Sequence, residues 1–215
     1  MPPAHSLFLR DPKIPRYVER REALRWQFRR IAALAGILSC VLIPPPFLKA
    51  QQPRASEFQV KAAYLYNFGR FVAWPGDGAS DASGAFEICV LGADPFGPTL
   101  DATLASGTIG GRIVTAKRIS KPQDVDSCRI LFISSSEEKH LKEVLSALDN
   151  TSVLTVSDIP RFSERGGMIG FILDGDRVRF DVNLSTTQSA RLTLSSELLK
   201  VATSVRKDSH SELFR

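Results

Sequence analysis

The segment Arg129-Ile130-Leu131-Phe132-Ile133 decides the fold, because four of its five residues are apolar and no polar alternation interrupts them. A short run of this kind is typical of a strand covered on both faces, as in a parallel sheet flanked by helices. Comparable runs occupy residues 86–91, 112–116 and 152–156. Segments with helical spacing of apolar residues separate these runs. This alternation predicts an α/β domain with a mostly parallel open sheet flanked by helices.

Capping residues and apolar spacing predict the helices around this sheet. The first covers residues 56–74, begins with Ser56 as its N-cap and ends before Pro75. Its aromatic stripe must be covered by the domain's own sheet or by another subunit. Further helices are expected after an Asp94 cap with Pro95 in the first turn, at residues 136–148 after a Ser136 cap, and at residues 195–205.

The end of the domain departs from strand–helix alternation. Asp174-Gly175-Asp176 separates two strand-like runs at residues 168–173 and 177–182. An Asp-Gly pair between such runs signals an antiparallel hairpin. We therefore predict a single domain at residues 56–205 whose sheet finishes with an antiparallel pair. Residues 206–215 are polar and are predicted to form a frayed tail.

The first fifty residues have the layout of a secretory signal peptide. A basic stretch at residues 20–30 precedes 13 apolar or small residues from Ile31 to Ile43, and three prolines and Ala50 follow. Thirteen residues are too few to cross a bilayer core, which needs about 20 helical residues. We predict that residues 1–50 are a cleaved leader, with an uncleaved membrane anchor as the alternative.

Removing this leader changes the charge of the protein. The whole chain carries +5, but residues 1–50 hold nine Lys and Arg against three Asp and Glu, which leaves 19 basic and 20 acidic residues. A net charge of −1 disfavours a nucleic-acid-binding surface. The remaining length suits one domain with a sizeable core.

Cys89 and Cys128 are the only cysteines after residue 50. In an exported domain an even count favours a disulfide, although two buried free thiols would also fit. A metal site would need more ligands, and His140 and His210 are the only histidines in this part of the chain. We expect neither a metal nor a cofactor.

Sequence motifs for catalysis are absent from the chain. There is no G-x-S-x-G elbow, no H-E-x-x-H pair and no phosphate-binding loop, and neither histidine lies in a suggestive context. The sequence therefore predicts that the protein is not an enzyme.

The turn from Gly92 to Gly97 follows the carboxyl end of a predicted strand, where open α/β sheets bind ligands. Asp94 and Phe96 lie in this turn. A small-molecule site is one interpretation of this turn. The alternative is that Asp94 caps the following helix, and its negative charge would repel an anionic ligand.

A second polar cluster comprises Arg179, Asp181 and Asn183, which share one face of a predicted strand. This face fits a solvated sheet surface with an ion pair, or alternatively a recognition surface for a partner. Together with Asp94, Phe96 and Arg112, these residues form our candidate partner or ligand surface.

A series of short motifs runs in order through residues 57–205: Lys61-Ala62-Ala63-Tyr64-Leu65-Tyr66-Asn67-Phe68, Phe71-Val72-Ala73-Trp74-Pro75, Ile88-Cys89-Val90-Leu91-Gly92, Asp94-Pro95-Phe96-Gly97, Gly111-Arg112, Cys128-Arg129-Ile130-Leu131-Phe132-Ile133-Ser134, Val153-Leu154-Thr155-Val156-Ser157-Asp158, Gly166-Gly167-Met168-Ile169, Arg179-Phe180-Asp181-Val182-Asn183 and Ser195-Ser196-Glu197-Leu198-Leu199. In this order they resemble the YfiR/HmsC-like family of periplasmic proteins.

The resemblance implies a non-enzymatic regulator in the periplasm of a Gram-negative bacterium. The best-known relatives bind the periplasmic sensor region of a membrane-bound diguanylate cyclase, lower cyclic-di-GMP output and biofilm formation, and are sequestered by an outer-membrane lipoprotein. The resemblance also implies a Cys89–Cys128 pair and a possible homodimer. Some relatives have a second disulfide near the segment that corresponds to Gly166–Ile169, and this chain lacks those cysteines.

Two function classes follow from the sequence. The first is a protein-binding repressor of the kind that the resemblance implies. The alternative is a small-molecule-binding module that feeds a membrane sensor through the crevice near Gly92–Gly97.

Overall fold

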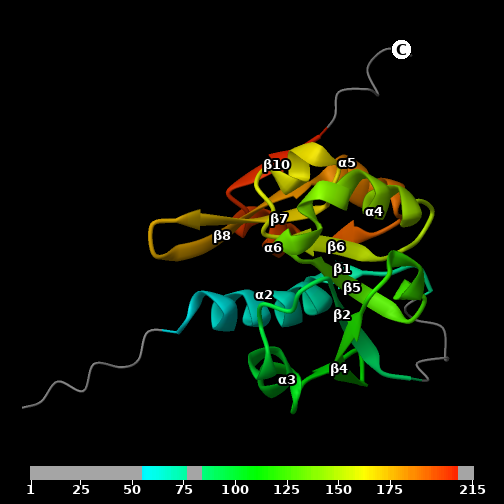
Figure 1. Cartoon of the computed structure of the whole chain (residues 1–215), viewed down its shortest axis with the longest axis vertical. Coiled ribbons are helices and arrows are strands. Elements are labelled where there is room, and N and C mark those ends of the chain that lie inside the picture. Colours follow the sequence, from blue (N-terminus) through cyan, green and yellow to red (C-terminus); the bar gives the residue numbers. More distant parts are fainter. Residues whose placement is uncertain (1–54, 77–83, 208–215) are drawn as a thin grey trace, which may run out of the picture. The chain divides into compact units, whose positions relative to one another are not determined.

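The computed structural model describes residues 55–76 and 84–207 (Figure 1). The predicted leader at residues 1–50 and the predicted tail beyond residue 207 lie outside the described residues. Cleavage of the leader therefore stays a prediction. Within the described residues, no helix is both long and apolar enough to cross a membrane.

An eight-stranded sheet forms the centre of the domain, in the order β10-β8-β7-β6-β5-β2-β4-β3. Its strands are β2 (Phe86–Leu91), β3 (Thr108–Ile109), β4 (Arg112–Ile119), β5 (Cys128–Ile133), β6 (Leu154–Ser157), β7 (Ile169–Asp174), β8 (Arg177–Asn183) and β10 (Ser204–Arg206). The five strands from β4 to β7 in this order are parallel. The predicted α/β class with a mostly parallel sheet is confirmed.

The C-terminal hairpin is also confirmed. Strands β7 and β8 pair antiparallel, and Asp174 and Arg177 flank the two-residue turn. The helix predicted at residues 195–205 is too long. Helix α6 (Ser196–Val201) ends early, and β10 follows and pairs parallel with β8, so Arg206 belongs to a strand. A short helix α5 (Leu184–Ser189), which was not predicted, follows β8.

Helix α2 (Glu57–Phe71) begins as predicted. The Ser56 hydroxyl accepts a hydrogen bond from the Gln59 N–H, and the Gln59 side chain accepts one from the Ser56 N–H, which completes a capping box. The predicted end at Trp74 is wrong. The chain leaves the helix at Val72 because strand β1 (Val72–Ala73) pairs with β9 (Thr193–Leu194).

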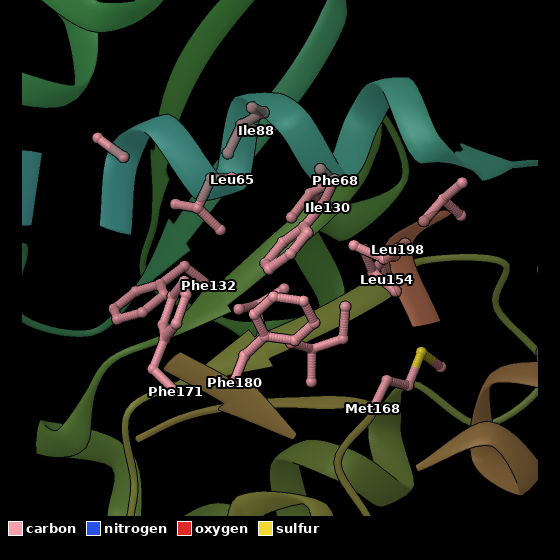
Figure 2. Packing of buried hydrophobic residues seen from close by; sticks show 14 of the residues in the cluster. Leu65, Phe68, Ile88, Ile130, Phe132, Leu154, Met168, Phe171, Phe180 and Leu198 are labelled. Atoms are coloured by element: carbon pink, nitrogen blue, oxygen red, sulfur yellow. The ribbon is translucent and has the colours of Figure 1, made fainter. Parts of the chain in front are cut away.

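The aromatic face of α2 is covered by the domain's own sheet. Leu65 and Phe68 are fully buried, and Figure 2 shows them among side chains from the strands, with the Phe68 and Phe180 ring centroids 5.1 Å apart. Burial of each such side chain contributes roughly 1.5–3 kcal/mol. Phe71 alone in this stripe is exposed, so the helix does not require a second subunit to cover it.

The opposite face of the sheet carries a second core. Leu131 and Ile133 of β5 point to this side and pack under helix α4 (Leu141–Ala147), whereas Ile130 and Phe132 point toward α2. The helix predicted from a Ser136 cap starts differently. A 3-10 helix η2 (Ser135–His140) precedes α4, and its cap is Ser134.

The structure joins Cys89 to Cys128 by a disulfide between the neighbouring strands β2 and β5, with Cα atoms 5.8 Å apart. Both residues are buried in the second core. Glu87 lies beside the two sulfurs. Because each sulfur is bonded to the other, this cluster offers no thiolate to a metal.

Candidate functional site

The structure does not bring the six candidate surface residues together. Asp94 and Phe96 follow the carboxyl end of β2, whereas Arg112 begins the neighbouring β4 and lies at the opposite end of the sheet. Arg179, Asp181 and Asn183 are on β8, which is separated from β2 by three strands. Each group therefore has to be assessed separately.

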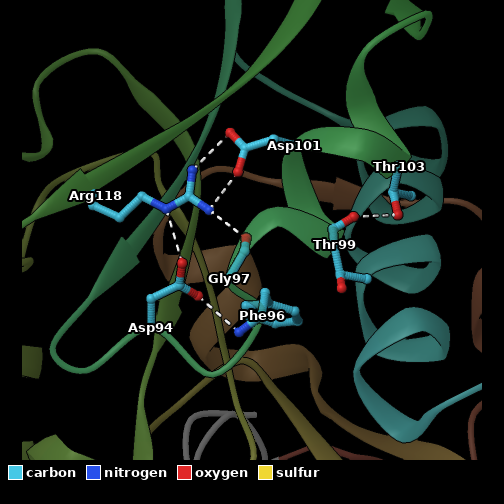
Figure 3. Close-up of polar contacts among 7 residues, drawn as sticks. All are labelled: Asp94, Phe96, Gly97, Thr99, Asp101, Thr103 and Arg118. Carbon is cyan, nitrogen blue, oxygen red and sulfur yellow. Dashed lines mark hydrogen bonds and ion pairs between the residues drawn. The ribbon is translucent and has the colours of Figure 1, made fainter.

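Asp94 belongs to an ion-pair cluster centred on Arg118 of β4 (Figure 3). The Arg118 Nε lies 2.9 Å from Asp94 Oδ2, and its terminal nitrogens donate to both oxygens of Asp101 and to the Gly97 carbonyl. These hydrogen bonds lower the pKa of Asp101 and raise the pKa of Arg118. The cluster fastens the loop after β2 to β4, which is a structural role.

The predicted helix cap at Asp94 is wrong. Asp94 Oδ1 accepts a hydrogen bond from the Phe96 N–H, while helix α3 (Pro98–Leu104) starts later, after Gly97. Arg118 competes for this carboxylate and holds it outside the helix. Phe96 is buried, and its ring lies 4.8 Å from that of Phe132, so it is a core residue rather than part of a surface.

The crevice expected near Gly92 is filled by the domain itself. In a doubly wound sheet the crevice lies where strand order reverses, and here that point falls between β2 and β5. The Ser136 hydroxyl accepts a hydrogen bond from the Ala93 N–H. A Cβ on Gly92 would lie 2.4 Å from Ser136 Oγ, so the two loops are in close contact.

Arg112 packs against the core at the amino end of the sheet. Its guanidinium carbon lies 5.3 Å from the ring centroid of Phe86, a distance at which a cation–π interaction forms.

The three polar residues of β8 have different roles. Arg179 is exposed and pairs with Asp174 across the hairpin, at 2.8 Å. Asn183 is buried and caps α5 by accepting a hydrogen bond from the Thr186 N–H. Asp181 Oδ2 accepts a hydrogen bond from Ser163 Oγ at 2.6 Å. Of the three, Asp181 also lines a pocket.

This pocket, which we call the Lys61 pocket, has a volume of about 550 Å³. It lies at the carboxyl ends of β5 and β6, between the N-terminal turn of α2 and strand β7. Its polar lining consists of Glu57, Lys61, Ser135, Asp158, Arg161, Glu164 and Asp181, and its apolar lining of Pro160, Phe171, Ile172 and Leu173.

Lys61 is the unusual residue of this pocket, because only 2% of its side chain is exposed. Its ammonium group forms ion pairs with Glu57 and, at 2.7 Å, with Asp158. It also lies 4.9 Å from the Phe58 ring centroid. A buried ammonium is costly unless it is paired in this way, so Lys61 ties the start of α2 to the end of β6.

Sequence reasoning missed this pocket. Lys61 sits four residues after Glu57, a spacing that places the two side chains on one helix face. Asp158 directly follows a strand at the edge where ligand sites form. Both signals were present, but only the fold places Asp158 beside a lysine 97 residues earlier.

The order β4-β2-β5-β6-β7 defines the class of the protein. It is a doubly wound α/β domain with the flavodoxin-like order 2-1-3-4-5, extended by β8, β10 and β3, which run antiparallel to these five strands. The chain belongs to the YfiR/HmsC-like family, whose model matches residues 58–203.

Comparison with solved structures gives one match in fold and one weaker match. A conserved domain protein from Vibrio cholerae O1 biovar El Tor is similar at a TM-score of 0.51 and 10% identity, over 70% of this chain and 60% of that one. The present chain thus spans about 60% of the length of that protein. The ABC domain from Streptococcus pneumoniae, solved in complex with L-Trp, matches at a TM-score of 0.43 and 12% identity, over 56% of this chain and 55% of that one.

Proposed function

We propose that this protein is a periplasmic, non-enzymatic regulator that binds the sensor region of a membrane-bound diguanylate cyclase and represses it. Repression lowers cyclic-di-GMP signalling and thereby biofilm formation. The observation that carries the proposal is the family match, which extends over nearly the whole described domain. Residues 1–50 have the layout of a signal peptide, and export by this leader would bring the domain to the side of the membrane where such a sensor region lies.

The hydrogen bonds between Asp101 and Arg118 lower the pKa of the carboxyl group and raise that of the guanidinium, and they fasten a loop. Hydrogen bonds at the start of α6 lower the pKa of the exposed Glu197. We assign these three groups structural roles. Repression then requires only that the domain bind the inactive state of the cyclase more tightly than the active state.

Deletion of the gene tests this proposal. We expect cyclic-di-GMP and biofilm mass to rise, and the wild-type chain to restore both. A chain that lacks residues 1–50 is the matched control, because it stays in the cytoplasm and should not restore repression. Affinity purification of the exported chain from membranes should recover a cyclase. Unchanged cyclic-di-GMP, together with recovery of no cyclase, would refute the proposal.

Regulation of the complex forms a further part of the proposal. An outer-membrane lipoprotein would relieve repression by sequestering this protein, and a homodimer would match the two-fold symmetry of a dimeric cyclase. Light scattering of the exported chain measures the oligomeric state.

The alternative function is a small-molecule-binding module that feeds a membrane sensor. The contact between Ala93 and Ser136 fills the crevice in which the sequence predicted a ligand. The observation that favours a small-molecule-binding function is therefore the Lys61 pocket. A thermal-shift screen of periplasmic metabolites tests this alternative, and no stabilisation by any member of a broad panel would count against it.

A further inference from the structure

Strand β7 has an open edge beside the Lys61 pocket. Its parallel pairing with β6 ends at Ser157↔Gly170, whereas its antiparallel pairing with β8 continues to Asp174↔Arg177. The hairpin therefore extends past the end of β6, as Figure 1 shows. Among the described residues, no strand pairs with β7 on the β6 side after Gly170.

The register shows which backbone groups this edge presents. The Phe180 carbonyl accepts a hydrogen bond from the Thr203 N–H, so the backbone N–H and C=O of Phe180 point away from β7. Phe171 pairs with Phe180 in the antiparallel ladder, and its backbone N–H and C=O therefore point away from β8. The same holds for Leu173, two residues further along β7. Leu173 is 55% exposed and lines the pocket. An exposed apolar edge with unpaired N–H and C=O groups is a template for an added strand.

The pocket wall beside this edge is negatively charged. Four carboxylates and two cations, Lys61 and Arg161, line the pocket. Arg206 pairs with one of the carboxylates, that of Glu164, and the net charge of the wall is still negative. One oxygen of Asp158 and one of Asp181 are buried without a hydrogen-bond partner within the described chain. Buried carboxylate oxygens need donors, and a lysine or arginine side chain supplies several from one group.

We propose that the open edge of β7 and the Lys61 pocket form a docking site for an extended segment of a protein partner. The segment adds a strand beside Phe171–Leu173 and directs a lysine or arginine side chain to Asp181. Backbone pairing supplies affinity and the basic side chain supplies specificity. The inference rests on the proposed function, because it takes the partner to be the sensor region of the cyclase.

Charge argues against a second copy of this chain as the occupant. Two copies that paired through β7 would bring two acidic pockets toward each other, which like-charge repulsion disfavours. A basic segment meets the opposite charge on both sides of the strand. The site is thus complementary to a foreign strand.

Nuclear magnetic resonance of the 15N-labelled chain, purified from the periplasm, tests the site. The probe is a six-residue peptide of alternating valine and threonine with one central lysine, and its control carries glutamate instead. The lysine peptide should shift and protect the Leu173 amide, and the glutamate peptide should bind at least about tenfold more weakly. Equal binding of the two peptides, or shifts confined to other regions, would overturn the proposal. Protection of the Leu173 amide without peptide would also overturn it, because the chain itself would then occupy the edge.

Leu173→Pro removes the edge N–H without touching the pairing to β8, because that N–H points away from β8. It should abolish peptide binding and leave the melting temperature nearly unchanged, whereas Leu173→Val keeps the N–H and should bind. Asp181→Asn should remove the preference for lysine over glutamate.

The same variants separate this inference from the proposed function. A purified sensor region that binds wild type and Leu173→Pro equally overturns the docking site and leaves the proposed function standing. Peptide binding at β7 without any binding of the sensor region supports the site and counts against the proposed partner.

Discussion

Removal of the Cys89–Cys128 disulfide should lower the stability of the domain by about 4 kcal/mol. The bond closes a loop of 39 residues, and the chain-entropy model assigns about 4 kcal/mol to a loop of this length. For a domain of this size, each kcal/mol shifts the melting temperature by about 2–4 °C. The expected loss is therefore about 8–16 °C.

The assay compares thermal unfolding of the oxidised wild type, the reduced wild type and a Cys89→Ala, Cys128→Ala double variant. Alanine avoids burying hydroxyl groups at two sites that exclude water. The reduced wild type keeps both sulfurs, so its loss measures the bond alone, and the further loss in the double variant measures packing. Identical melting temperatures for the oxidised and reduced wild type would refute the reasoning.

Three other substitutions test two polar contacts and one close loop contact by urea unfolding. Arg118→Ala should cost about 1 kcal/mol at pH 7, because Asp101 is largely exposed. The lowered pKa of Asp101 stabilises the fold above about pH 4, so this difference should shrink as the pH falls through the folded-state pKa. Lys61→Met should cost about 2–3 kcal/mol, because the partly buried Asp158 carboxylate loses its partner. Gly92→Ala should cost about 1–3 kcal/mol through its positive φ and a clash.

Matched variants control for the changes at Lys61 and Gly92. Lys200→Met removes an exposed lysine and should change stability by less than about 0.5 kcal/mol. Gly110→Ala imposes a positive φ where the space is open, so it isolates the backbone cost from the clash at Gly92. A constant effect of Arg118→Ala from pH 7 to pH 3, or a loss at Lys61 no larger than at Lys200, would contradict the assigned contacts.

The main strands could be predicted from sequence because their signals are local. Strand β2 begins and ends at the predicted residues, and β5 begins one residue early. The hairpin followed from its Asp-Gly turn. In contrast, β10 has three exposed residues, and β1 and β9 have two residues each. Such short segments become strands only because a distant segment pairs with them, and no local pattern records that pairing.

The candidate site was harder to predict for a related reason. Asp94 followed by Pro95 has the signature of a helix start, but Arg118, 24 residues later, takes the carboxylate. Lys61 lies within a strongly apolar helix, where its burial depends on Asp158 at a separation of 97 residues. Roles that depend on long-range charge pairs cannot be read from spacing along one element.

The geometry at the carboxyl ends of the strands favours a protein partner over a small ligand at the usual place. A doubly wound sheet opens a crevice at its switch point because the loops on either side diverge. Here the loop after β2 is fastened by Arg118 and lies against Ser136, with glycine at position 92 where the two loops touch. The Lys61 pocket lies instead beside β7, where one wall is an unpaired strand edge and the other carries the partly buried carboxylates Asp158 and Asp181. A strand edge offers its N–H and C=O groups at a regular spacing, which matches an extended backbone better than it matches a compact metabolite.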